Sequence, residues 1–140
     1  FFTSFIDAIP ETDDVRVFIE YFIDSYMDHI SANEGLVRFI IWEIQSGAHL
    51  MPRHIKNLFM SRGYRKPLFV YKIEKAIEEG QIRQIDPVNL VISLLGLCAY
   101  PFIARPLLEK VFTGLDIASA AFLEQRKTEI FNMVWRGIRP

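Results

Sequence analysis

Apolar residues recur along this chain at the three- and four-residue spacing of α-helices, and no segment alternates as a strand does. The clearest helix is predicted over 15–30, where Arg16, Glu20, Asp24 and Asp28 recur every fourth residue and form one polar stripe. The opposite face is made of Val15, Phe18, Ile19, Phe22, Tyr26 and Ile30. A helix with so wide an apolar face belongs in the middle of a bundle.

Turn and capping residues divide the rest of the chain into further helices. The other predicted elements are the end of a helix over 1–9, a helix over 34–48 capped by Asn33, a short helix around 55–59 that is interrupted near Gly63, a helix over 66–79, a helix over 87–104 bent near Pro101 and Pro106, and a last helix over 117–136 capped by Asp116. We therefore expect one all-α domain over 1–140, a bundle of about five to seven helices.

The stretch over 80–104 is the most informative part of the sequence. Gly80 can adopt the left-handed conformation that ends a helix, Asp86 can cap the next helix, and Pro87 fits its first turn. The helix that follows has no charge over 88–104 and is apolar on nearly every side. A chain of 140 residues has too few other elements to cover such a helix. Part of its surface should therefore be covered by a second copy of the protein.

The predicted dimer uses this apolar helix and the last helix of the chain. The candidate interface residues are Val91, Leu94, Leu95, Cys98 and Phe102 on the first, and Ala120, Leu123, Ile130, Phe131, Val134 and Trp135 on the last. Leaving five large side chains in water would forgo about 1.5–3 kcal/mol each, a total of about 10 kcal/mol that matches the stability of a typical domain. Two helices from each copy predict a two-fold four-helix bundle.

Aromatic side chains provide a candidate ligand site. Phe, Tyr and Trp make up 14% of the chain, and their positions on inner helix faces fit either an ordinary core or a cavity for an apolar molecule. The candidate ligand-binding residues are Phe22, Tyr26, Trp42, Phe59, Phe69, Asn89, Ser93 and Tyr100. Asn89, Ser93, Gly96 and Tyr100 form one stripe of mainly small and polar side chains, which can either orient a ligand or let another helix approach closely. The sequence leaves both uses open.

Composition and charge limit the partners. The net charge of −1 provides no long-range attraction for DNA or an acidic membrane. No acidic residue lies between Glu43 and Glu74, and this basic interval is interpreted as a solvated corner of the bundle rather than a nucleic-acid patch. The single cysteine, Cys98, suits a reducing compartment, so a cytoplasmic protein is expected. A membrane span is not expected, because 88–104 is short for one and is interrupted by polar residues and proline.

Motifs for catalysis and metal binding are missing from the sequence. It contains no HExxH, no G-x-S-x-G, no phosphate-binding loop and no CxxC. His49 and His54 are five residues apart, which turns them to different faces of a helix and makes them a poor metal pair. We therefore expect no enzymatic activity, no metal and no cofactor.

The residues around the turn after Gly80 also carry a family resemblance. The run 79–87, Glu-Gly-Gln-Ile-Arg-Gln-Ile-Asp-Pro, followed by Leu90 and the Ser-Leu-Leu-Gly-Leu of 93–97, resembles the C-terminal domain of TetR-family transcriptional regulators. The helix order is similar over most of the chain. In that family this segment joins the helix bordering the ligand cavity to the first helix of the dimer bundle. Residues 1–9 resemble the end of the helix that leads from the N-terminal DNA-binding domain, which this sequence lacks.

The resemblance implies a homodimeric regulator that contacts DNA only through the missing N-terminal domain. The hypothesis is that an apolar or aromatic effector binds around Phe22, Tyr26, Trp42, Phe69 and Tyr100. Binding would shift the connecting helix, so that the two DNA-reading heads no longer match their half-sites.

Two alternatives remain: a stand-alone helical carrier of hydrophobic small molecules, and a purely structural dimerisation module whose aromatic residues are all core. A structure without a cavity above about 300 Å³ would favour the second.

Overall fold

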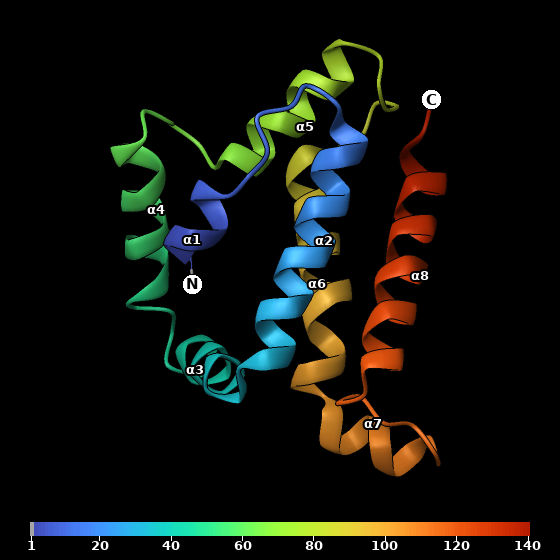
Figure 1. The fold of residues 1–140 in the computed structure, drawn as a ribbon. Coiled ribbons are helices and arrows are strands. Elements are labelled where there is room, and N and C mark those ends of the chain that lie inside the picture. Colours follow the sequence, from blue (N-terminus) through green and yellow to red (C-terminus); the bar gives the residue numbers. More distant parts are fainter. Residues whose placement is uncertain (1) are drawn as a thin grey trace.

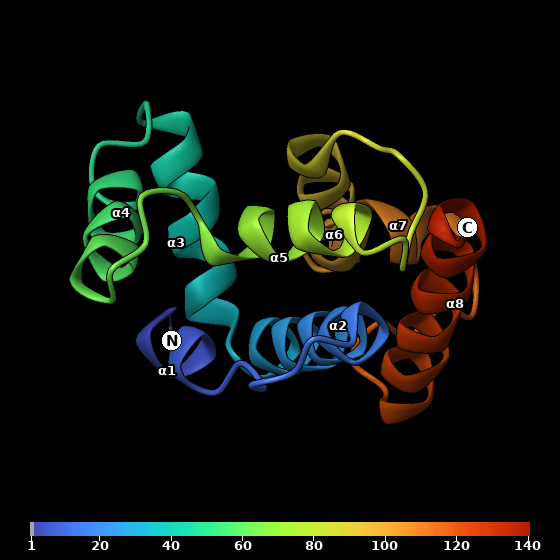
Figure 2. The same cartoon turned by 90° about the horizontal axis from the view of Figure 1, so that it is seen from above.

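The computed structural model describes residues 2–140, and Phe1, expected within the first helix, lies outside them. Within this range the chain forms eight α-helices and no strand (Figure 1), which confirms the all-α prediction. The helices are α1 (Phe2–Asp7), α2 (Val15–Ala32), α3 (Glu34–Gln45), α4 (Met51–Ser61), α5 (Leu68–Glu78), α6 (Pro87–Ile103), α7 (Arg105–Val111) and α8 (Ala120–Ile138). The helix beyond the expected number is α7. Figures 1 and 2 show α3 and α4 on the opposite side of the molecule from α8.

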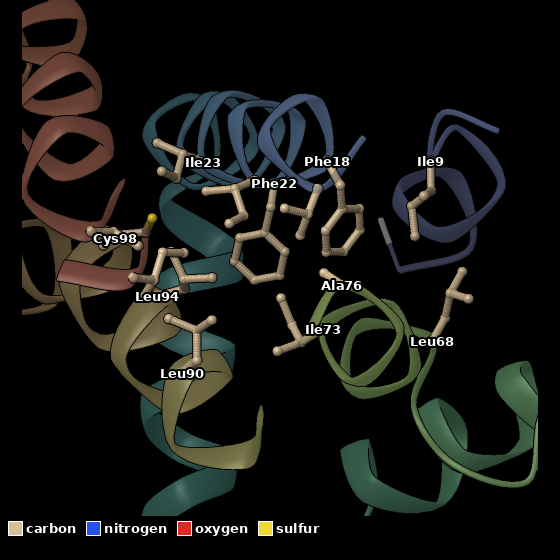
Figure 3. Close-up of a cluster of buried hydrophobic side chains, with 14 of the residues drawn as sticks. Ile9, Phe18, Phe22, Ile23, Leu68, Ile73, Ala76, Leu90, Leu94 and Cys98 are labelled. Carbon is tan, nitrogen blue, oxygen red and sulfur yellow. The ribbon is translucent and has the colours of Figure 1, made fainter. Parts of the chain in front are cut away.

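Helix α2 is the centre of the core, as its wide apolar face predicts. Its N-cap is Asp14, whose carboxylate accepts the backbone N–H of Arg16 at 2.9 Å. Phe18 and Phe22 point from α2 toward α5 and α6, Ile23 lies on the side of α8, and all three are buried (Figure 3). The burial of this face between neighbouring helices contributes to the hydrophobic stabilisation of the fold.

The polar stripe of α2 is a contact face for α8. The Lys127 ammonium on α8 donates to Asp24 at 2.7 Å, to Asp28 at 2.6 Å and to Glu124 at 3.3 Å. Burial lowers the pKa of Lys127, but the hydrogen bonds to the carboxylates outweigh it and raise the pKa above its ordinary value. The acidic residues that lie four positions apart on α2 therefore hold α8 against α2 in addition to facing solvent.

The turn between α5 and α6 has the predicted geometry. Gly80 adopts a φ of 74°, and the Asp86 carboxylate accepts the N–H groups of Val88 at 2.8 Å and Asn89 at 3.1 Å at the start of α6. The Gln81 side chain accepts the N–H of Val15 at 2.8 Å. This turn therefore fixes the start of α6 relative to the start of α2.

The end of the chain differs from the prediction in two details. The bend expected near Pro101 and Pro106 is a 69° break between α6 and α7, with Pro101 inside α6 and Pro106 in the first turn of α7. Helix α8 begins three residues after the predicted start, because Ser119 accepts the N–H of Phe122 at 3.1 Å while Asp116 closes the preceding turn. Across residues 2–140 no single helix is both long enough and apolar enough to cross a membrane. Helices α6 and α7 have the required length and apolarity only when they are counted together.

Candidate ligand-binding site

An apolar cavity of about 640 Å³ lies between α4 and the helices α2, α5 and α6, with α1 and α3 completing its wall. Its apolar lining consists of Phe2, Phe5, Ile6, Phe22, Tyr26, Ile40, Met51, Ile55, Phe59, Pro67, Phe69, Val70, Val88, Val91, Ile92 and Leu95. The described lining includes only two charged side chains, Lys66 and Glu74, which form an ion pair with each other. A concave apolar surface with few polar groups is the usual form of a small-molecule site.

A second hollow, of about 660 Å³, lies on the surface near the turn between α1 and α2. Several of its lining side chains are charged, and two ion pairs cross it: Arg62 with Asp7 and Lys75 with Asp13. Because its lining mixes apolar with charged side chains, four of which already neutralise each other, the more uniformly apolar cavity beside α4 is the stronger candidate site.

The aromatic wall of the cavity is centred on Phe69 of α5. Its ring meets Phe22 of α2 edge to face with the centroids 5.3 Å apart, and Phe59 of α4 in the same geometry at 5.5 Å. Phe5 of α1 lies 5.6 Å from Phe69, and Tyr26 stacks on Phe22 at 5.8 Å. Such ring pairs stabilise beyond simple area burial. Four helices thus share one aromatic cluster that also forms the surface of the cavity.

The titratable groups on the α2 and α6 side of the cavity are neutral. Burial raises the pKa of Tyr26 to about 12, and burial raises the pKa of the Cys98 thiol, which lies in the core rather than in the lining, to about 12. Both groups therefore keep their protons at neutral pH. Across residues 2–140 no group of three or more His, Cys, Asp or Glu side chains is placed to hold a metal ion.

Helix α1 connects the cavity to α2 and α4. Its Phe5 side chain lies in the cavity wall, and the Phe5 carbonyl accepts the Tyr21 hydroxyl of α2 at 2.8 Å. Its last residue, Asp7, accepts two hydrogen bonds from the Arg62 guanidinium at 2.6 and 2.9 Å, and this pairing holds the pKa of Asp7 below its usual value. A change in the spacing of α2 and α4 therefore acts directly on α1.

Helix α4 is held at its start by a carboxylate from α3. Glu43 is only 1% exposed, and its oxygens accept the backbone N–H groups of His49, Leu50 and Met51. Burial raises the pKa of Glu43, but the three N–H donors outweigh it and lower the pKa below its ordinary value. The turn between the two helices includes Ala48 at a φ of 59°, and Glu43 restrains this unusual backbone.

The structure brings together half of the predicted ligand-binding residues. Phe22, Tyr26, Phe59 and Phe69 line the cavity. The other four lie outside it on exposed helix faces, namely Trp42, Asn89, Ser93 and Tyr100. The indole of Trp42 is exposed because α3 contributes only Ile40 to the wall, and Asn89, Ser93 and Tyr100 are exposed because α6 turns a different side toward the cavity.

The predicted dimer residues on α6 face inward. Val91 and Leu95 line the cavity, and Leu94 and Cys98 are fully buried among α2 and α8 side chains (Figure 3). Leu94 and Cys98 are fully covered within one chain, whereas Val91 and Leu95 are only half-buried, and the contact of these residues with a partner chain stays a prediction. Phe102 is half-buried and packs on the same core.

The predicted dimer residues on α8 divide in the same way. Ile130 and Val134 are buried in the core of the single chain, and their contact with a partner chain stays a prediction. Phe131 and Trp135 stack on each other at 6.1 Å and lie under the Arg16 guanidinium of α2. Leu123 is half-buried against the core, and Ala120 is exposed.

Several cavity residues escaped the sequence analysis. Met51 and Ile55 precede the predicted Phe59 at four-residue spacing and form one stripe of α4 with it, a signal that was present in the sequence. Lys66 and Glu74 are eight residues apart and on different sides of a helix start, and only the fold brings them together.

The fold is an all-helical domain that contains one large apolar cavity among its described residues. The chain matches the family described as tetracyclin repressor-like, C-terminal domain, over residues 17–134. Because the match spans most of its 140 residues, the chain belongs to this family of TetR-like C-terminal domains, which have a regulatory role in effector binding and dimerisation. A search of curated proteins finds no match.

Proposed function

We propose that this domain senses an apolar or aromatic small molecule in the cavity beside α4 and that binding releases the regulator from DNA. The observation that carries the proposal is the cavity itself. Its volume of about 640 Å³ falls within the range of about 300–1,000 Å³ of small-molecule sites. A purely structural dimerisation module has no use for an internal apolar space of this size.

The route to DNA runs through α1. TetR-like regulators act on DNA through an N-terminal domain, and α1 is the helix of this domain that lies nearest to the N-terminus. A ligand that contacts Phe5 and spreads α4 from α2 displaces α1, because Arg62 and Tyr21 bind it from the two sides. Coupling of this kind is typically about 1–3 kcal/mol between two sites, enough to change operator affinity severalfold or more.

The dimer in this proposal uses the outer face of α6 together with α8. Asn89, Ser93, Gly96 and Tyr100 form the exposed stripe of α6, and a side chain placed at Gly96 would meet open space. Helix α8 lies beside this stripe, since Arg126 donates to the carbonyl of Leu97 at 3.1 Å. The small side chains allow a second α6 to approach closely, as a two-fold four-helix bundle requires.

Calorimetric titration of the domain with a panel of apolar and aromatic compounds tests the site. Val91→Phe places a ring in the cavity and should abolish binding, whereas Ile44→Phe adds the same group to the exposed side of α3 and should leave binding unchanged. Operator binding by the full-length regulator, with and without the ligand, then tests release. Binding that survives Val91→Phe would refute the site, and ligand binding without any change in operator affinity would favour the carrier function.

A further inference from the structure

The charged groups of the cavity lie together at its rim. Lys66 lies in the loop before α5 and Glu74 lies on α5, and the two side chains form an ion pair. They are 50% and 37% exposed, so they border solvent as well as the cavity. Every other described lining side chain is apolar or is the neutral Tyr26. A ligand in this cavity therefore meets charge at one place only.

The surroundings of this rim are electropositive. Between Glu43 and Glu74 the sequence contains only basic charged residues. Of those closest in sequence to Lys66, Arg62 is paired with Asp7, and Arg65 is exposed. Helix α5 also begins here, with Pro67 at its N-cap position and no side chain capping it, so the positive end of its dipole lies beside Lys66. Both the basic residues and the positive end of the α5 dipole thus favour an anionic ligand.

We propose that the ligand is an amphipathic acid, an apolar chain or ring with one carboxylate, and that its carboxylate takes Lys66 from Glu74. This proposal rests on the proposed function and specifies the class of effector. The apolar part of the ligand fills the space beside Phe69. The carboxylate stays at the rim, where one side of it remains hydrated. The exchange is favourable because an exposed ion pair is weak and the released Glu74 is hydrated at the surface. A cationic ligand would instead have to enter the electropositive rim.

Three ligands of the same chain length separate the possible head groups: octanoate, octanol and octylamine. Calorimetric titration of the chain at neutral pH should give octanoate an affinity up to about fivefold higher than octanol, the worth of one exposed ion pair. Octylamine should bind more weakly than octanol, because its ammonium meets Lys66 and the positive end of α5.

Variants of the ion pair assign the effect to Lys66. Lys66→Met should remove the advantage of octanoate and leave the affinity for octanol unchanged, whereas Glu74→Gln should strengthen octanoate binding by removing its competitor. Lys110→Met is the matched control, because Lys110 is exposed on α7, far from the cavity lining, and the substitution is the same. The melting temperature of each variant verifies that it is folded.

The outcomes distinguish this inference from the function on which it rests. Equal affinities for the three ligands, or the tightest binding for octylamine, would overturn the carboxylate assignment and leave the apolar site in place. A preference for octanoate that persists in Lys66→Met would equally overturn the role of Lys66. If none of the three ligands binds the wild-type chain, both the acid preference and the apolar site are refuted.

Discussion

The ring of Phe22 on α2 meets the ring of Phe69 on α5 edge to face, with centroids 5.3 Å apart and an angle of 89° between their planes. Phe22 is 1% exposed and belongs to the core, yet it also lines the cavity. The inner wall of the candidate site is therefore part of the core, whereas its mouth, at Val88 and Ile92, is exposed. Residues of its wall determine stability and ligand shape at the same time.

Replacing Phe22 tests this double role. Phe22→Ala removes a buried ring that packs on Phe69, Phe5 and Tyr26, and the free energy of unfolding should fall by about 3–5 kcal/mol. Phe39→Ala on α3 removes a 38% exposed ring and should cost about 1 kcal/mol or less. Urea denaturation measures both. Equal losses for the two variants would contradict the placement of Phe22 in the core.

Glu43→Gln tests the link between α3 and α4 through its pH dependence. The folded-state pKa of Glu43 lies below its ordinary value, so its stabilising contribution is present above the ordinary glutamate pKa of about 4.3 and is lost as the pH falls. Glu43→Gln should therefore lower the melting temperature at neutral pH. The difference in melting temperature between the variant and the wild type should shrink as the pH falls below the ordinary glutamate pKa and through the lower pKa of Glu43 in the folded state.

The exposed Glu78 on α5 supplies the control for that measurement, since Glu78→Gln removes a carboxylate at the surface. Its melting temperature should follow that of the wild type at neutral pH. A Glu43→Gln difference that stays constant from neutral to acidic pH would show that the carboxylate charge does not hold α4.

Arg62→Gln tests the attachment of α1. The substitution removes the two charged hydrogen bonds to Asp7 at the end of α1 and should increase amide hydrogen exchange in α1, with little change in α2. In the full-length regulator, ligand affinity should be largely retained while ligand-induced release from the operator weakens. Arg65→Gln, at an exposed neighbouring position, should change neither. Unaltered exchange in α1 would contradict a role for this ion pair in coupling.

Gly96→Arg tests the proposed dimer face. A Cβ at this exposed position meets no neighbouring atom within 4 Å in the single chain, and arginine has a higher helix propensity than glycine, so the protomer should remain folded. In a dimer that pairs the α6 stripes, a long charged side chain prevents close approach. Sedimentation equilibrium should show a monomer for Gly96→Arg and a dimer for the control Ile44→Arg on α3. A dimeric Gly96→Arg variant would exclude this face.

Much of the local structure was predictable because it depends on neighbouring residues. The caps at Asn33 and Asp86 and the left-handed Gly80 act within one turn of their own helices, and all three occur as predicted. The apolar face of α2 was predictable because a polar stripe defines its other side. The late start of α8 shows the limit of this reasoning, since Asp116 and Ser119 are both good caps and the sequence does not choose between them.

The sequence by itself determined that the chain folds into helices and where most of them begin, because capping and periodicity are local properties. Only the tertiary structure decided which side of α6 faces the cavity. That helix is apolar nearly all around, so its pattern defines no inner face, and the packing of α2, α5 and α8 sets its rotation. This rotation buries Leu94, directs Val91 to the cavity and leaves Tyr100 exposed. The meeting of Lys66 with Glu74 at the rim likewise depends on how the chain turns into α5.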